Sequence, residues 1–297
     1  MRVFVTGATG FIGSAVVAEL RGAGHEVVGL ARSDRAAASL AAAGAQVHRG
    51  ALDDPESLRS GAAAADGVVH TAFVHDFADY AGAAETDRRA ISALGEALAG
   101  SGRPFVVTAG AIVRPGRVAT EEDVPDPGLP LPRTSEQAAL AFADRDVRVS
   151  VVRLPPSVHG EGDHGFVPQL IHIARTTGVS GYPDDGANRW PAVHRLDAAH
   201  LFRLALEAAP AGARLHGVAD GGVPVREIAE VVGRNLGLPV TPVPRPRVEE
   251  HFGWIGAFFS LDVPASSVLT QEQLGWSPAQ PGLLPDLDAG HYFARTP

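Results

Sequence analysis

Short runs rich in β-branched residues alternate with alanine-rich stretches along the first 154 residues of this 297-residue chain. This alternation is typical of a parallel sheet that helices cover on both faces. It predicts an α/β fold built on a doubly wound parallel sheet. The predicted strands are Arg2–Thr6, Glu26–Ala31, Gln46–Arg49, Gly67–Ala72, Pro104–Ala109 and Val147–Leu154. The predicted helices between them are Gly13–Gly22, Arg35–Ala43, Glu56–Ala64, Ala83–Ala99 and Ser135–Ala143.

The regular alternation fades beyond Pro155, where proline and glycine become frequent. We interpret residues 1–155 as one domain and residues 156–297 mainly as a smaller C-terminal α+β lobe on the carboxyl edge of the sheet. Residues from about 190 to 220 are expected to return to the first domain. The helices predicted in this half are Val167–Thr176, Leu196–Ala208 and Val225–Leu236.

Two residue types are missing from the chain, and their absence excludes several chemistries. There is no cysteine, which excludes disulfides, thiolate metal sites and cysteine nucleophiles. All 25 residues in the lysine-plus-arginine count are arginine, so Schiff-base chemistry and a Walker-type phosphate lysine are excluded as well. The net charge is −9 and no long basic run is present, so we expect no nucleic-acid partner.

No segment predicts export or membrane insertion. The chain opens on a predicted strand rather than on a charged segment followed by a long apolar run, so we expect no signal peptide. No apolar run approaches the roughly 20 residues that a membrane-spanning helix requires. We therefore predict a cytoplasmic protein with no membrane partner.

A glycine-rich turn joins the first predicted strand to the first predicted helix, which is the context of a phosphate-binding turn. Gly7 permits the tight exit from the strand, Gly10 lets the backbone approach a pyrophosphate, and Gly13 lets the helix pack closely on the sheet. The helix N-terminus adds free N–H groups and a partial positive charge. The turn predicts a dinucleotide site; the alternative is a plain glycine turn.

The end of the second predicted strand indicates which nicotinamide dinucleotide to expect. A site for NAD presents a carboxylate to the ribose 2′-hydroxyl at this point. This chain has Arg32 and Ser33 there, followed by Arg35, and an arginine can stack on the adenine while it pairs with a 2′-phosphate. We therefore predict NADPH over NADH. In the alternative, Arg32 is solvated and Asp34 accepts the hydroxyl.

Five motifs carry a resemblance to a known family. They are Thr6-Gly7-Ala8-Thr9-Gly10-Phe11-Ile12-Gly13, Val68-Val69-His70-Thr71-Ala72, Val106-Val107-Thr108, Arg153-Leu154-Pro155 before Val158-His159-Gly160, and Ala192-Val193-His194-Arg195-Leu196-Asp197. Together they resemble the extended short-chain dehydrogenase/reductase family, the group of NAD(P)-dependent epimerases, dehydratases and reductases. The resemblance covers about the first 205 residues. It implies a Rossmann domain with a C-terminal substrate lobe.

The resemblance also implies which residues surround the cofactor. Thr9, Phe11 and Ile12 belong to the glycine loop, and Leu52 is expected near the adenine. The residues expected to line the nicotinamide side are Thr71, Ala72, Phe73, Thr108, Pro155, Ser157 and Val158.

The chain departs from the family pattern where proton transfer takes place. Typical members use Tyr-x-x-x-Lys, in which the lysine lowers the pKa of the tyrosine and the tyrosine transfers the proton. Pro132 and Glu136 occupy those two positions here. The usual serine falls near Ala109-Gly110, which leaves Thr108 as the nearest hydroxyl, and Ala51 replaces the usual acidic residue. The resemblance is therefore to an atypical member, for which the standard mechanism is not expected.

Other side chains are candidates for moving the proton. His75 and Tyr80 lie in the loop after the fourth predicted strand, which borders the substrate space in this fold, and histidine titrates near neutrality. Thr108 can polarise a carbonyl by a hydrogen bond but is a poor acid. Glu136 is interpreted first as part of a helix-capping arrangement with Arg133, and only second as a catalytic base.

Two further groups contain chemistry-bearing side chains. The segment His159–His164 contains metal-ligand residue types, but its two glycines favour a polar turn, and we predict no metal site. His194 and Asp197 are interpreted as structural. Aromatic residues in the lobe are expected to form its core and an apolar substrate site. These are Tyr182, Trp190, Phe252, Trp254, Phe258 and Phe259.

Three functions are compatible with these features. The leading hypothesis is an NADPH-dependent reductase of a carbonyl or imine group on a small, largely apolar metabolite, acting as a monomer or homodimer. The second is an epimerase or dehydratase that uses bound NAD(P) transiently, which requires a strong base near the nicotinamide. The third is a non-catalytic NADP-binding sensor, which the loss of both usual catalytic residues favours.

Overall fold

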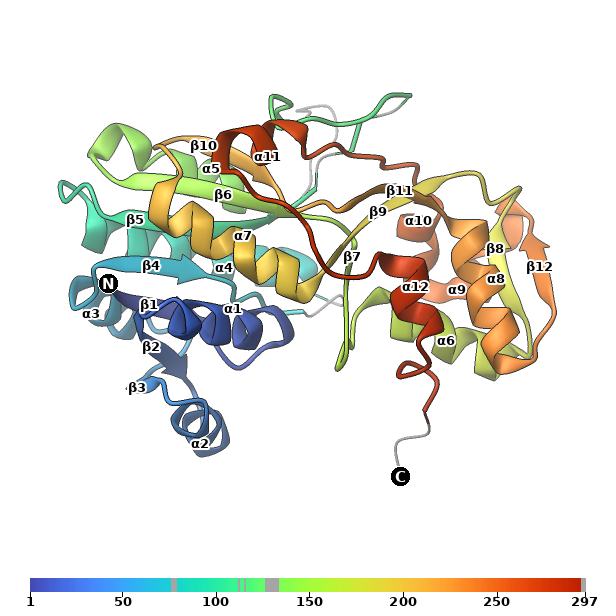
Figure 1. The fold of residues 1–297 in the computed structure, drawn as a ribbon, viewed down its shortest axis with the longest axis horizontal. Helices are drawn as coiled ribbons and strands as arrows, with labels where there is room; N and C mark the ends of the chain where they lie inside the picture. The colour runs from blue at the N-terminus through green and yellow to red at the C-terminus, as the bar shows by residue number, and fades with distance from the viewer. Residues whose placement is uncertain (76–78, 112, 115, 126–133, 295–297) are drawn as a thin grey trace.

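A seven-stranded parallel sheet is the largest sheet among the described residues and occupies one half of the molecule (Figure 1). The computed structural model describes residues 1–75, 79–111, 113–114, 116–125 and 134–294. In sheet order the strands are β10 Ala213–His216, β6 Arg148–Leu154, β5 Pro104–Gly110, β4 Gly67–His70, β1 Arg2–Thr6, β2 Glu26–Ala31 and β3 Gln46–Arg49. The sheet grows in one direction from β1 to β3 and in the other from β4 onward. The carboxyl ends of β1 and β4 therefore form the switch point, where open α/β sheets bind ligands.

The strands send alternate side chains to the two faces of the sheet. In β1, Val3 and Val5 belong to one hydrophobic core, whereas Phe4 belongs to the core on the opposite face. In β5, Val106 joins the first core and Phe105 the second. Because both faces of these strands are apolar, helices must cover both.

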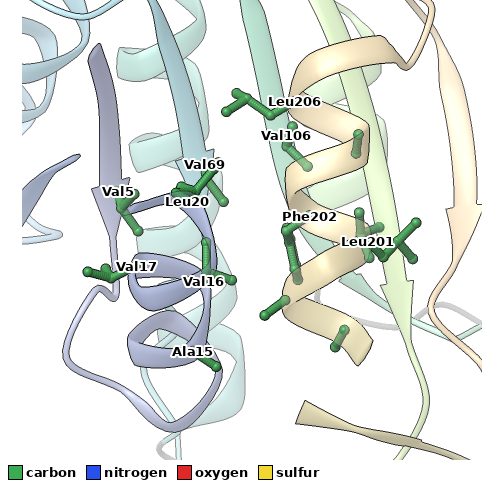
Figure 2. Close-up of a cluster of buried hydrophobic side chains, with 14 of the residues drawn as sticks. Val5, Ala15, Val16, Val17, Leu20, Val69, Val106, Leu201, Phe202 and Leu206 are labelled. Carbon is green, nitrogen blue, oxygen red and sulfur yellow. The ribbon is translucent and has the colours of Figure 1, made fainter. Parts of the chain in front are cut away.

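Two layers of helices provide this cover. On the face of Val3, α1 (Phe11–Gly22) lies beside α7 (Arg195–Ala208), and Leu20 and Phe202 pack between the helices and the sheet (Figure 2). The same core takes in Leu40 of α2 (Asp34–Ala42). The opposite face is covered by α3 Pro55–Ala63, α4 Tyr80–Leu98 and α5 Ser135–Leu140.

The second half of the chain has its own hydrophobic core, which includes Leu170, Trp190 and Ile228. Its strands form two small sheets. The three-stranded sheet has the order β11 Asp220–Pro224, β9 Arg189–His194 and β7 Ser157–His159, and the two-stranded sheet pairs β12 Val240–Val243 with β8 Ser180–Pro183. The remaining helices are α6 Phe166–Thr177, α8 Val225–Leu236, α9 Val248–Phe252, α10 Gly256–Phe259, α11 Val268–Leu274 and α12 Leu283–Asp288, with 3₁₀ turns at Ala143–Arg145, Arg245–Arg247 and Gly253–Ile255. Within the described ranges, no helix is long and apolar enough to cross a membrane.

The predicted fold class is confirmed, and all six predicted strands are present. Several element boundaries shift by one to three residues; the fifth predicted helix, for example, ends at Leu140 rather than Ala143. The first helix begins at Phe11 rather than Gly13, and the fourth strand ends at His70, two residues before the predicted end. The seventh strand, β10, was not expected, because its sequence contains no β-branched residue; it joins the sheet by pairing in parallel with β6.

A buried ion-pair cluster ties α5 to the sheet. Arg153 of β6 is fully buried and donates to both carboxylate oxygens of Glu136, at 2.8 and 2.7 Å. Arg214 of β10 adds a third hydrogen bond to Glu136 at 2.8 Å. Arg153 also donates to the backbone oxygens of Glu121 and Asp123, which fixes the backbone at residues 121–123. Burial raises the pKa of Glu136, but the two arginines outweigh it, and the pKa lies below its ordinary value.

We expect Glu136→Gln to destabilise the protein by about 3–5 kcal/mol, because it leaves the buried Arg153 without its counter-charge. The folded-state pKa of Glu136 is lowered, so the pair stabilises the fold fully above the ordinary value of 4.5, and this contribution is lost as the pH falls below it. Chemical denaturation from pH 7 to pH 3 measures both effects. Glu56→Gln, at an exposed ion pair with Arg59, is the control and should leave stability unchanged. Equal stability of the Glu136 variant and the parent at pH 7 would contradict the assignment.

Candidate cofactor and active site

The glycine loop lies at the switch point and contacts the end of β4 directly. Gly7 has a φ of +69°, and a Cβ at this position would lie 2.7 Å from the backbone nitrogen of Ala72. At Gly13, a Cβ would lie 2.0 Å from the carbonyl oxygen of Gly7. Both positions therefore exclude any side chain. The amide of Gly10 closes the turn by donating to the Gly7 oxygen at 2.9 Å.

A buried hydrogen-bond chain aligns the strand ends beneath this loop. The hydroxyl of Thr6 lies 2.7 Å from Nδ1 of His70, and Nε2 of His70 lies 3.1 Å from a carboxylate oxygen of Asp87 on α4. The second oxygen of Asp87 accepts a hydrogen bond from the hydroxyl of Ser135 at the start of α5. His70 and Asp87 are both 0% exposed. The chain thus connects β1, β4, α4 and α5 where water does not reach.

Two threonine hydroxyls complete the alignment. Thr71 donates to the carbonyl of Thr6 at 2.8 Å, and Thr108 on β5 donates to the carbonyl of His70 at 2.9 Å. Thr108 is 9% exposed. Its hydroxyl proton is therefore used to hold two neighbouring strands in register, next to the segment that the sequence placed on the nicotinamide side.

At the end of β2, three predicted cofactor residues lie together. Arg32 and Arg35 are exposed, and Ser33 caps α2 by accepting a hydrogen bond from the amide of Ala36. The carboxylate of Asp34 lies 2.6 Å from Arg49 of β3. Asp34 therefore already has a cationic partner. Leu52, the residue expected near the adenine, packs against the core that covers Phe4.

The candidate proton donors His75 and Tyr80 both lie close to one aromatic ring, that of Phe73. The ring centroid of Phe73 is 5.3 Å from that of His75 and 5.8 Å from that of Tyr80. Tyr80 is the first residue of α4, which Asp79 caps by accepting from the amide of Gly82 at 2.9 Å. The structure thus brings together both donors and a residue predicted to line the nicotinamide side.

Glu136 lies elsewhere. Its carboxylate is engaged by Arg153 and Arg214 in the buried cluster described above, and the helix cap, Thr134, makes no capping hydrogen bond through its side chain. Arg133, the partner expected from the sequence, and Pro132, which occupies the family tyrosine position, both lie outside the described residues. The ion pair, rather than a helix cap, is the role that the geometry gives Glu136.

The segment after β6 leads from the sheet to β7. Pro155 is buried, Val158 packs against the core beneath α1, and the buried hydroxyl of Ser157 has no hydrogen-bond partner among the described residues. In the following loop, the hydroxyl of Tyr292 accepts from the amide of Gly160 and donates to Asp163. Burial and the Asp163 charge raise the pKa of Tyr292 above its ordinary value. This tyrosine holds the loop in place.

His159 and His194 have structural contacts. Nδ1 of His159 lies 2.8 Å from Asp286, and His194 accepts from the amide of Leu196 at the start of α7. Asp197 accepts from two backbone amides near residue 280. Among the described residues, no group of three histidine or carboxylate side chains has the geometry of a metal site.

Three of the six predicted aromatic residues pack around Phe166. Its ring lies 5.5 Å from Trp190, 5.8 Å from Trp254 and 6.3 Å from Phe258. Trp190 is buried, whereas Trp254 and Phe258 are 45% and 44% exposed. The cluster therefore includes both lobe core and an accessible aromatic surface.

The glycine cradle, the orphan hydroxyl of Ser157 and the sheet switch point fit a nicotinamide dinucleotide, and they define a dinucleotide-binding Rossmann protein. Comparison with known proteins agrees. The profile of the NAD dependent epimerase/dehydratase family matches residues 3–125. The chain belongs to this family, as its resemblance to extended short-chain dehydrogenases/reductases predicted.

Individual relatives are similar over most of the chain. The uncharacterized protein C2A9.02 of Schizosaccharomyces pombe is 51% identical over 99% of this chain and 100% of its own length. The 2′-dehydrokanamycin reductase of Streptomyces kanamyceticus is 31% identical over 83% of this chain and 70% of its own. The dTDP-glucose 4,6-dehydratase DesIV of Streptomyces venezuelae, solved with NAD bound, has the same fold, with a TM-score of 0.78, 22% identity and coverage of 98% and 96% of the two chains.

Sequence reasoning missed the His70 and Asp87 pair and also missed Arg195. His70 was quoted within a strand motif, but a histidine inside a buried strand does not reveal its partner on a helix 17 residues away. Arg195 was quoted beside the structural residues His194 and Asp197. The structure places it against Phe11 of the glycine loop, with its guanidinium carbon 5.1 Å from the ring centroid.

We expect Gly10→Val to abolish binding of NADPH and NADH while the protein stays folded. A Cβ at Gly10 meets only the Gly7 oxygen, at 3.2 Å, so the larger side chain extends into the space for the pyrophosphate rather than into the core. Gly13→Ala, by contrast, should cost about 3 kcal/mol of stability through its backbone clash. Calorimetric titration and thermal unfolding of both variants distinguish the two roles. Retained cofactor binding by Gly10→Val would show that the loop is only a turn.

Proposed function

We propose that this protein is an NADPH-dependent reductase of a carbonyl or imine group on a small, largely apolar metabolite. Its family and its relatives support an NAD(P)-dependent enzyme of the oxidoreductase or epimerase type. The observation that carries the preference for NADPH is the end of β2, where Arg32 and Arg35 are exposed while Arg49 engages Asp34. Two exposed guanidinium groups favour a 2′-phosphate, and the engaged carboxylate is less suited to a ribose hydroxyl.

Reduction fits the chemistry of the remaining site better than epimerisation. A bound nicotinamide supplies the hydride. The protein then has to orient the substrate, exclude water and deliver one proton. His75 and Tyr80, gathered around Phe73, are suited to that single delivery. The relative named 2′-dehydrokanamycin reductase is consistent with this class of reaction.

One alternative lacks a chemical element of the site, and the other is separated from the reductase by experiment. An epimerase or dehydratase needs a strong base, and the pKa of Glu136 is lowered by two arginines that already engage its carboxylate. A sensor that binds NADP without turnover is favoured by the missing Tyr-x-x-x-Lys pair. Incubation of the purified protein with NADPH and a panel of ketones, aldehydes and imines separates the three. Consumption of NADPH supports the reductase, substrate conversion without net consumption supports the epimerase, and binding without either supports the sensor.

Arg32→Ala should weaken NADPH binding by about 1.5–3 kcal/mol and leave NADH nearly unchanged, because the lost contact is to the 2′-phosphate alone. Arg49→Ala is the complementary variant. It frees Asp34, so we expect NADH to gain relative to NADPH. Isothermal titration with both cofactors measures these ratios. Equal losses of NADPH and NADH in Arg32→Ala would overturn the proposed preference.

Replacement of the true proton donor should lower the reduction rate by about 10²–10⁴-fold and leave NADPH affinity unchanged. The variants are His75→Ala and Tyr80→Phe, with the exposed His172→Ala on α6 as the control. Single-turnover rates at saturating NADPH separate proton delivery from binding. If both variants keep full activity on the native substrate, neither residue is the donor and this assignment is wrong. The cytoplasmic location and the monomeric or dimeric state expected from the sequence stay predictions.

A further inference from the structure

Arg195 combines a defined position with an unused charge. It is the first residue of α7 and half-buried, and its guanidinium lies over the ring of Phe11, the first residue of α1. Among the described residues, no carboxylate lies within ion-pair distance of Arg195. The guanidinium of Arg195 also donates no hydrogen bond to any of the described residues. A partly buried arginine without a counter-charge is costly unless another anion occupies the site in the working protein.

Two of the acidic residues near Arg195 are already engaged. Asp163 accepts from Tyr292 and from the amide of Gly165, and Asp197 accepts from two backbone amides. Arg203, eight residues further along α7, is by contrast neutralised by ion pairs with both Glu19 and Glu207. Arg195 is therefore left with its charge available, at the end of α7 that meets the glycine loop.

The fold also holds the side chain of Arg195 in place. A Cβ at Gly160 would lie 3.3 Å from Cγ of Arg195, so the stem of the side chain runs against bare backbone. The ring of His164 packs against Phe11 from the same loop, with centroids 5.8 Å apart. The stem of Arg195 is thus packed against Gly160, and its guanidinium ends beside the N-terminus of α1, where the N–H groups of a glycine loop can bind phosphate.

We propose that Arg195 binds the pyrophosphate of the nicotinamide dinucleotide, closing over it from the second half of the chain while the glycine loop holds it from the first. The inference rests on the proposed function only in that the glycine loop must bind a dinucleotide. Because the pyrophosphate is common to NADPH and NADH, Arg195 contributes equally to both. Arg32 contributes to NADPH alone. The two arginines therefore divide recognition of one ligand between its common and its distinguishing phosphate groups.

Titration calorimetry on the full chain tests this proposal with three ligands: NADPH, NADH and adenosine 2′-monophosphate. Arg195→Ala should weaken NADPH and NADH by the same factor, at least tenfold, and leave adenosine 2′-monophosphate unchanged, because that probe has no pyrophosphate. Arg195→Lys should recover part of the loss by restoring the charge. Arg145→Ala is the matched control, because Arg145 lies 5.0 Å from the ring centroid of Phe142, far along the chain from the glycine loop.

The outcomes separate this inference from the proposed function. If the parent protein binds neither dinucleotide, the proposed function fails. If the parent binds both and Arg195→Ala binds them equally well, only the role of Arg195 is overturned. A loss confined to NADPH would place Arg195 at the 2′-phosphate and also overturn the proposal. A loss that includes adenosine 2′-monophosphate, with a lowered unfolding temperature, would show a purely structural role for the contact with Phe11.

Discussion

The site depends on the buried hydrogen bond between Thr6 and His70, the last residues of β1 and β4. These strands flank the point where the sheet changes its direction of growth. In a dry interior each polar atom needs a partner, and Asp87 and Thr108 supply the remaining ones to His70. The carboxyl ends of β1 and β4 are consequently aligned, with Thr6 opposite His70. The turn at Gly7 packs directly against Thr71 and Ala72. The cradle for a phosphate is produced by this alignment.

The chain contains no lysine, and its arginines carry out several distinct tasks. Arg153 is fully buried and is neutralised by Glu136, so α5, which carries the position of the family's lysine, is here anchored by an ion pair. Arg32 remains exposed at the end of β2. Arg195 lies between these extremes, since it is half-buried and stacked on Phe11 but has no counter-charge among the described residues. An arginine whose guanidinium finds partners within the protein stabilises the fold, whereas one without them can bind an anionic ligand.

Under the proposed function, the two halves of the chain share the ligand. The first half supplies the glycine loop and the arginines at the adenine end, and the second half supplies Arg195 and the aromatic surface of Trp254 and Phe258. Cofactor binding would then connect α1 with α7, which already pack together above the sheet (Figure 2). Proton delivery by His75 or Tyr80 would come from the opposite layer, at the start of α4.

The sequence by itself determined the parallel sheet, the glycine cradle and the family, because these depend on local signals: β-branched runs, helix periodicity and glycines required at fixed spacing. It also identified Arg32 and the residues around Phe73 as candidates. It could not place Glu136, whose partners Arg153 and Arg214 lie on strands 17 and 78 residues away. Nor could it identify β10, His70 with Asp87, or Arg195 beside Phe11. Each of these depends on contacts between distant segments, and only the tertiary structure decides which charges meet a partner and which remain available.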